Sequence, residues 1–179
     1  LVTMTGNAAA QAWPSKPVRV VVAFTAGGTT DILARGVGQQ LADKLKQSFV
    51  IDNKPGAGGN TGSEMAARSP ADGYTLLVGS VGPIAVNPTL YPKLPYNPLT
   101  DLVPIVQIAE VPNVLVLHPS VPAKTFDEFL AYAKANPGKL NFASTGIGTS
   151  SHLSGFVLGK RATIDAQHVP YKGADALRD

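Results

Sequence analysis

The sequence predicts an α/β fold of two lobes with a cleft between them. Stretches with the apolar pattern of strands alternate along the chain with stretches that have the spacing of helices, which is typical of a parallel or mixed sheet in each lobe. A strand pattern, a glycine-rich turn and a helix start follow one another over residues 18–31, and the same succession returns over residues 140–153. Because these two turns fall in different halves of the chain, we expect one in each lobe, facing the cleft.

Composition excludes several classes of protein. The 179 residues are 44% hydrophobic and 15% charged, a core-forming composition that suffices for one ordinary domain or two small ones. The formal net charge is +3 without any block of basic residues, so we expect no nucleic-acid partner. The absence of cysteine excludes disulfides and thiolate metal sites. No apolar run approaches the roughly 18 residues that a membrane-spanning helix needs.

Residues 1–12 are interpreted as a signal-peptide remnant or a tail outside the fold. Residues 8–12, Ala-Ala-Ala-Gln-Ala, contain the small-x-small pattern of a signal-peptidase site just before Trp13. The alternative is a flexible alanine-rich tail. The signal-peptide interpretation predicts a secreted protein.

The first turn, Ala26-Gly27-Gly28, joins a buried strand over residues 18–22 to a helix that begins directly behind it. Two glycines let a ligand approach the backbone closely because they carry no Cβ atom. The helix start adds free N–H groups and the positive end of a dipole, so the turn predicts an anion site. The alternative is a plain strand-to-helix connection with nothing bound.

The helix behind this turn is predicted over residues 29–47, with Thr29 or Thr30 as its cap and Asp31 complementing the dipole. A short strand is predicted over residues 49–51. An apolar stripe of the helix is expected to face the sheet: Leu33, Val37, Leu41 and Leu45.

Residues 53–60 form a glycine-rich loop that lacks the spacing of a phosphate-binding motif and is interpreted as structural. Thr61 and Glu64 have the spacing of a capping box for a short helix. A strand over residues 74–78 then ends in a loop of small residues that includes Ser80. Ligands gather at the carboxyl ends of parallel strands, so Ser80 is a candidate ligand contact, with a plain loop as the alternative.

Six prolines between residues 83 and 104 predict loop and short turns, and the chain is expected to cross into the second lobe over residues 103–109. Thr125 and Glu128 predict a capped helix, which Pro137-Gly138 ends. Its apolar face is expected to be Phe126, Phe129, Leu130 and Ala133.

The second turn, residues 144–151, follows a strand over residues 140–143 and precedes a helix. A last strand over residues 166–169 leads into a loop over residues 171–173. At the helix start, His152 either faces the cleft or bonds to the backbone, and the second alternative is favoured.

Motifs of catalysis are missing. No Gly-x-Ser-x-Gly elbow occurs, and His118, His152 and His168 lack the spacing of a zinc site, so we predict neither an enzyme nor a metal or cofactor. An α/β enzyme of acyl or phosphoryl transfer, in which distant residues meet at the cleft, is the alternative function. Asp31 could serve as a base or bind an amine, although a role in stabilising the turn is favoured.

Several stretches, in one order over nearly all of residues 13–179, resemble one family. They are Trp13-Pro14-x-Lys16-Pro17, residues 24–31, residues 53–59, residues 69–74, Asn87-Pro88-x-Leu90-Tyr91, Leu94-Pro95-Tyr96, residues 143–153 and residues 170–173. Together they are similar to the Bug/TctC family, the extracytoplasmic solute receptors of tripartite tricarboxylate transport systems. The resemblance implies a two-lobed periplasmic-binding-protein architecture, type II-like, that closes like a Venus flytrap.

The family resemblance also implies a function: capture of a small organic carboxylate in the periplasm for a membrane transporter. A dicarboxylate, a tricarboxylate, an acidic amino acid and an aromatic acid all stay open as ligands, and sensing for a membrane kinase is an alternative to transport. The ligand-binding positions carried over are Thr25, Ala26, Gly27, Gly28, Asp31, Ser80, Val81, Thr145, Gly148, Thr149 and Ser150.

The predicted first lobe spans residues 13–103 and the second spans residues 104–179. Members of the family run beyond this length, through the rest of the second lobe and back into the first. The resemblance therefore predicts two incomplete lobes, in either a fragment or a natural short form.

Overall fold

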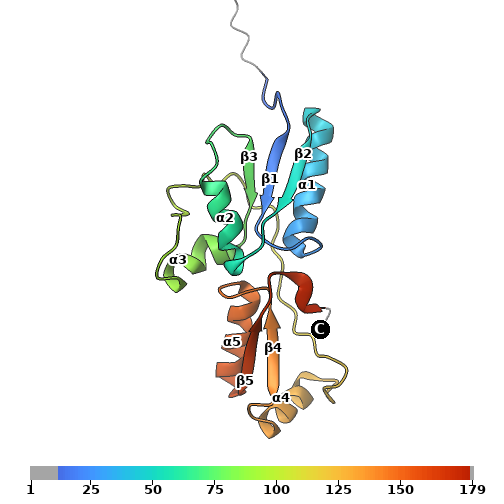
Figure 1. The fold of residues 1–179 in the computed structure, drawn as a ribbon. Helices are drawn as coiled ribbons and strands as arrows, with labels where there is room; N and C mark the ends of the chain where they lie inside the picture. The colour runs from blue at the N-terminus through green and yellow to red at the C-terminus, as the bar shows by residue number, and fades with distance from the viewer. Residues whose placement is uncertain (1–11, 178–179) are drawn as a thin grey trace, which may run out of the picture.

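The computed structural model describes residues 12–177 and contains two parallel sheets (Figure 1). The strand order of the first sheet is β2-β1-β3, and the second sheet pairs β4 with β5. In chain order the elements are β1 (Val18–Val22), α1 (Thr29–Leu45), β2 (Phe49–Asn53), α2 (Asn60–Ala67), β3 (Thr75–Val78), α3 (Asn87–Leu90), α4 (Phe126–Ala135), β4 (Leu140–Ser144), α5 (Ser150–Ala162) and β5 (Ala166–Pro170).

We call β1–β3 with α1–α3 the first lobe, and β4–β5 with α4–α5 the second lobe. The alternation of strands and helices confirms the predicted α/β fold, and each lobe has its own sheet. The lobe boundary at residue 103 stays a prediction. Residues 1–11, which carry most of the expected signal-peptidase motif, lie outside the described residues.

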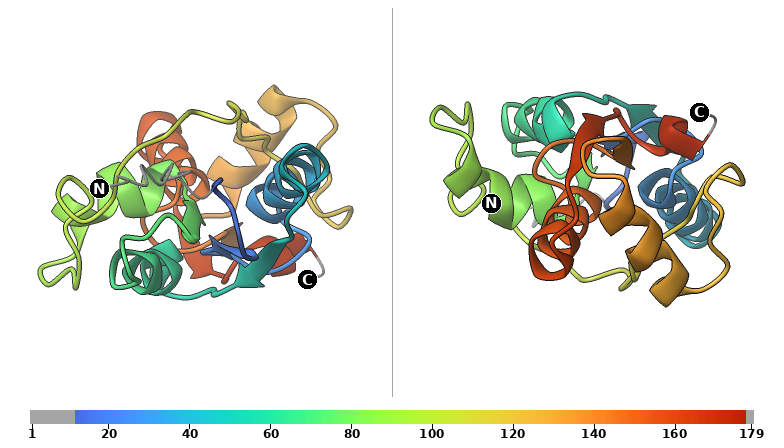
Figure 2. Two further views of the ribbon diagram at one scale, coloured as in Figure 1. Left: turned by 90° about the horizontal axis from the view of Figure 1, so that it is seen from above. Right: turned by 90° about the horizontal axis from the view of Figure 1, so that it is seen from below.

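The core of the first lobe forms around its central strand β1, which is covered on both faces. Val20 and Val22 pack with Ala34 of α1. On the opposite face of the sheet, α2 contacts β1 and β3 (Figure 2). Val21, on the opposite face from Val20, is also fully buried. This two-sided burial explains the continuous valine run of β1, because a strand with both faces covered needs no polar alternation.

The closest approach of α1 to the sheet is made by small residues. Ala34 and Gly38 are buried, and a Cβ atom on Gly38 would lie 3.4 Å from Ile51 Cδ1. The predicted leucine and valine stripe is only half-buried along the flank of this contact. The prediction that Thr29 or Thr30 caps α1 is wrong: Gly28 occupies the cap position and no side chain caps the helix.

The capping box expected for α2 is also wrong. The cap position is Gly59, with φ 94°, and no side chain caps the helix. A Cβ atom on Gly59 would lie 3.0 Å from Phe24 and 3.1 Å from Pro83. The local sequence pattern predicts Thr61 as the cap. Close packing around Gly59 instead makes the helix begin earlier, at Asn60.

Residues 82–90 are helical, which corrects the prediction of a proline-rich loop. A π-helical segment, Gly82–Val86, runs directly into α3. Pro83 sits in the first turn of this helical stretch, where a missing N–H breaks no helical hydrogen bond, and Pro88 lies at the start of α3, where the π-helical segment ends. Proline count alone therefore misjudges this stretch.

Between α3 and α4 the chain contains no helix or strand within the described residues. The apolar runs 105–108 and 114–117 lie in this segment, and Ile105 and Val114 are each more than three-quarters exposed. The segment joins the two lobes along the side of the molecule (Figure 1).

The capping box of α4 is confirmed. Thr125 Oγ1 accepts from the backbone N–H of Glu128, while the Glu128 carboxylate accepts from the Thr125 N–H. On the apolar face, Phe129 and Ala133 are buried but Phe126 is 53% exposed, so that part of the prediction is wrong. No helix within residues 12–177 is both long and apolar enough to cross a membrane.

Replacing Thr125 with alanine is expected to lower the free energy of unfolding by about 1 kcal/mol, because the cap hydrogen bond is lost. Urea denaturation measures the change. Thr89→Ala, at an exposed position of α3, is the matched control and should change stability by less than about 0.5 kcal/mol. Equal losses in both variants would contradict the role of the cap.

Candidate functional site

The carboxyl ends of the two sheets face each other, so the turns that follow the strands meet between the lobes (Figure 1). The turns after β1 and β3 belong to the first lobe. The turn after β4 and the loop after β5 belong to the second lobe. The predicted site residues all lie in or beside the turns after β1, β3 and β4. None of them lies in the loop after β5.

A buried carboxylate holds the turn after β1. Asp31 is 2% exposed, and its Oδ2 accepts from the Gly27 N–H and from Arg35 Nε, each at 2.9 Å. Its Oδ1 accepts from Asn53 Nδ2 at 2.9 Å, and the same amide donates to the Phe24 carbonyl. Both oxygens are used inside the protein, so Asp31 supports the turn, as the favoured interpretation of the sequence expected.

These contacts explain the electrostatics of Asp31. The hydrogen bond from Arg35, together with those from Gly27 and Asn53, lowers the pKa of the Asp31 carboxyl from 3.8 to about 2, although burial opposes the change. The group is therefore ionised under all ordinary conditions and acts as a fixed negative charge. Such a group is unsuited to act as a base at neutral pH.

The turn itself exposes backbone. Gly27 has φ 81° and is exposed, whereas Gly28 is extended with φ −79°, so only one of the two glycines uses its conformational freedom. No side chain caps α1 at this point, in contrast to α4 and α5, which Thr125 and Thr149 cap. The first N–H groups of α1 are therefore available to an anion.

Thr25 contributes a buried hydroxyl to the same turn. Its Oγ1 atom is inaccessible to solvent and has no hydrogen-bond partner among the described residues. The loop after β5 covers it: a Cβ atom on Gly173 would overlap Thr25 Oγ1, and one on Gly28 would lie 3.7 Å from Ala174 Cβ. The second lobe therefore forms part of the wall around the first turn.

Ser80 and Val81 follow β3, next to the first turn. The register pairs Val22 with Val78, so the residues that follow these strands leave the sheet at the same edge. Ser80 is half-buried and Val81 is 52% exposed. The structure thus brings these two predicted residues to the edge that carries Thr25–Gly28.

The turn after β4 is held by its own hydroxyl groups. Thr149 is 4% exposed, and its Oγ1 donates to the Gly146 carbonyl at 2.6 Å. Thr145 contacts Ser151 Oγ through both its N–H and its hydroxyl. Ser150 is exposed and donates to Asn113 Oδ1 of the connecting segment.

Glycines bring this second turn into direct contact with the first lobe. A Cβ atom on Gly58 would overlap the Ile147 carbonyl oxygen, and one on Gly82 would lie 3.1 Å from the Gly148 carbonyl oxygen. A Cβ atom on Gly148 would overlap Asn87 Oδ1. The two lobes therefore meet backbone against backbone, and side chains larger than glycine would separate them.

Asn87, which the sequence analysis did not select, lies at the centre of this contact. It is fully buried, and its Nδ2 donates to Asn60 Oδ1 at 2.6 Å. Tyr96 donates to the Pro83 carbonyl at 2.7 Å and also reaches Asn60. Asn87 Oδ1 has no partner within the described residues. The Asn87-Pro88 motif was the only signal in the sequence that could have identified it.

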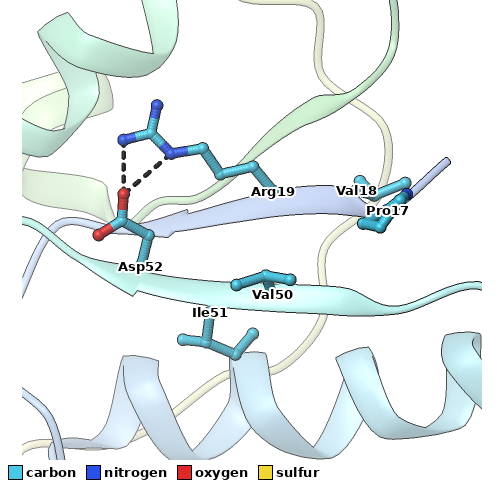
Figure 3. A pocket seen from close by; sticks show the side chains of 6 residues that line it. All are labelled: Pro17, Val18, Arg19, Val50, Ile51 and Asp52. Carbon is cyan, nitrogen blue, oxygen red and sulfur yellow. Dashed lines mark hydrogen bonds and ion pairs between the residues drawn. The ribbon is translucent and has the colours of Figure 1, made fainter.

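Two surface hollows lie elsewhere on the first lobe. One of about 370 Å³ opens on the face of the sheet where Arg19 of β1 pairs with Asp52 of β2 (Figure 3). The other, of about 470 Å³, lies between α1 and β2. Neither includes a residue of the turns. Within residues 12–177 no group of three or more His, Cys, Asp or Glu residues could hold a metal ion.

Comparisons with known proteins show which family the chain resembles. The model of the tripartite tricarboxylate transporter family receptor matches residues 33–179. The chain is 40% identical to the protein BugT of Bordetella pertussis over 166 residues, which cover 92% of this chain and 51% of BugT. The chain therefore spans about half the length of the curated relatives that it matches.

Two solved structures have the same fold. The Rpa4515 structure of R. palustris, with adipate, is 40% identical with a TM-score of 0.91, and the match covers 94% of this chain and 56% of that one. The MatC structure of Rhodopseudomonas palustris, with bound malate, is 35% identical with a TM-score of 0.85, covering 93% and 57%. The architecture is that of the two-lobed periplasmic binding proteins.

Proposed function

The chain belongs to the tripartite tricarboxylate transporter family of receptors, and we propose that it captures a small organic carboxylate in the periplasm. The observation that carries the proposal is the turn after β1, where α1 starts without a side-chain cap beside an exposed glycine backbone. Backbone N–H groups at a helix start favour a negatively charged ligand. Adipate and malate in the two related structures are both dicarboxylates, which supports this ligand class.

The ligand contacts that we propose come from both lobes. The first lobe contributes the turn after β1 and the start of the helix after β3, and the second contributes the turn after β4. Asp31 takes part by holding the first turn in place. The proposed contacts are Thr25, Ala26, Gly27, Gly28, Ser80, Val81, Thr145, Gly148, Thr149 and Ser150.

The family name implies the next step. A receptor that has closed on its ligand presents a surface to the membrane subunits of a transporter, and we propose such subunits as the partners of this protein. Export through a signal peptide would place the receptor in the same compartment. The proposal involves no catalytic step, because closure and release of the lobes are sufficient.

Malate or adipate is expected to stabilise the protein against heat, because only the folded protein carries the site. At about 100 times the dissociation constant, the ligand should add about 2.7 kcal/mol to the free energy of unfolding. A thermal-shift titration measures this, with ATP at the same concentration as the control. Stabilisation by ATP, and by no organic acid across a panel of dicarboxylates, tricarboxylates, acidic amino acids and aromatic acids, would contradict the proposal.

A further inference from the structure

Two histidines of the second lobe stack against each other beside the turn after β4. The ring centroids of His152, from α5, and His168, from β5, lie 4.2 Å apart with 28° between the ring planes. Phe142 of β4 stacks on His168 at 4.8 Å. The imidazoles therefore belong to a continuous stack of three rings that links all the secondary-structure elements around this turn.

Each imidazole is hydrogen-bonded to a different part of the turn. His152 Nδ1 accepts from the Gly148 N–H at 3.2 Å. His168 Nε2 lies 2.7 Å from Ser144 Oγ, and that hydroxyl accepts from the Gly146 N–H at 3.1 Å. The pair thus fixes both glycines of the turn, one directly and one through a serine that is 2% exposed.

Protonation changes these contacts unequally. Nδ1 of His152 can accept the Gly148 N–H only while it carries no proton, so a proton there would set two donors against each other. The Ser144 hydroxyl can instead donate to the Gly146 carbonyl, 3.3 Å away, when His168 becomes a donor. The contact between His152 and Gly148 is therefore the one that a proton breaks.

The surroundings favour the neutral pair. Burial, and next the nearby His152, hold the pKa of His168 below its ordinary value of 6.5. From the packed elements, β4 presents Phe142 and Ser144, and α5 presents His152. Among the described residues His152 is the titratable group that acts electrostatically on His168. Two imidazolium ions in a stack repel each other, so the first proton disfavours the second.

We propose that the stacked pair of His152 and His168 positions the turn after β4 for the ligand and releases this turn on protonation, so that carboxylate affinity falls in acid. The inference rests on the proposed function, because the turn is one of the proposed ligand contacts. The two histidines act as positioning residues and need not touch the ligand. A receptor with this property would bind most tightly at neutral pH.

Calorimetry with malate tests the pair between about pH 8 and about pH 5.5, the range in which histidine titrates. We expect the wild-type affinity to fall about tenfold over this range, the effect of losing one backbone hydrogen bond. His152→Phe keeps a ring in the stack but removes the acceptor, so it should bind about tenfold more weakly at every pH. His152→Asn places an amide oxygen near the position of Nδ1, so it should restore most of that affinity and flatten the pH profile.

His118→Gln is the matched control. His118 is exposed, bonds to Ser120 in the connecting segment and lies outside the stack, so its loss should leave the pH profile unchanged. Titration of malate itself affects all variants equally. A wild-type affinity that rises in acid, or a His152→Asn profile as steep as the wild type, would overturn the inference.

A second measurement keeps this test separate from that of the proposed function. In the protein without ligand, NMR should show that exchange of the Gly148 amide hydrogen accelerates as the pair is protonated, relative to its own rate in His152→Asn. If no acid of the panel tested above binds while this amide responds, the proposed function is wrong and the role of the histidine pair stands. If both ligands bind while the amide ignores the titration, the inference is wrong.

Discussion

Replacing Asp31 with alanine is expected to lower the free energy of unfolding by about 3 kcal/mol, because this buried side chain of α1 holds the turn after β1. The side chain is 2% exposed and accepts hydrogen bonds from Gly27, Arg35 and Asn53. Alanine leaves the Gly27 N–H and the Asn53 amide without this acceptor. Arg35 is 55% exposed, so water partly replaces its bond to the carboxylate, and the remaining loss comes from the two neutral donors.

Urea denaturation at neutral pH measures the change. Asp43→Ala is the matched control, because it makes the same substitution at an exposed position of the same helix, and it should cost less than about 0.5 kcal/mol. Losses of equal size in the two variants would show that the turn does not depend on the buried carboxylate.

Urea denaturation of the wild type and of Asp31→Ala at several pH values tests whether the negative charge of Asp31 stabilises the fold. Because the pKa of Asp31 is about 2 in the folded protein and 3.8 ordinarily, its ionised form stabilises the fold above pH 3.8. This contribution, at most about 2 kcal/mol, is lost as the pH falls from 3.8 towards about 2. The stability difference between wild type and Asp31→Ala should therefore shrink at acid pH. A difference that stays constant would assign the effect to packing.

Much of the fold could be predicted because its signals are local. The valine run of β1 predicts a strand, and the glycines after it predict a turn. The capping box at Thr125 predicts a helix start. Each of these signals comes from neighbouring residues alone. The favoured role of Asp31 was also a local inference, since an acid in the first turn of a helix complements its dipole. These predictions needed no knowledge of distant contacts.

The errors share a different cause. Thr61 has the spacing of a cap, but Gly59 packs against Phe24 and Pro83, which are distant in the sequence, and this contact sets the start of α2. In α1 the small residues Ala34 and Gly38 approach the sheet more closely than the larger apolar residues, which hydrophobic spacing alone does not reveal. Tertiary packing decided these positions.

The proposed site was predicted as separate turns, and their arrangement was not. The sequence indicated that residues 25–28 and 145–150 matter, but not that the loop at Gly173 covers the first turn. Asn87 was noted only as part of a family motif, and its place in the contact between the lobes was not predicted, because its burial depends on Gly58 and Gly148, which lie some 30 and 60 residues away along the chain. Contacts across so many residues leave no periodic pattern.

Replacing Gly148 with alanine is expected to weaken malate binding by about a hundredfold, equivalent to about 2.7 kcal/mol. Gly148 is buried at φ 83°, and a Cβ atom would overlap Asn87 Oδ1 and lie 3.2 Å from Leu90 Cδ2, both in the first lobe. The added methyl group therefore acts as a wedge, because the lobes must separate to admit it. A ligand held between separated lobes loses the contacts of one lobe and remains partly in water.

Gly138→Ala is the control that isolates this wedge. Gly138 also has a positive φ, 69°, and lies in the second lobe, but its Cβ atom would meet only Asp165, at 3.3 Å, within the same lobe. Both variants carry similar backbone strain, about 1–3 kcal/mol. A difference in their malate affinity, measured by calorimetry, therefore reports on the wedge between the lobes and not on the strain. We expect Gly138→Ala to lose stability but keep its malate affinity, and Gly148→Ala to show a larger radius of gyration in X-ray scattering. If both variants lose affinity equally, backbone strain is the cause; if neither does, closure does not depend on the contact between Gly148 and Asn87.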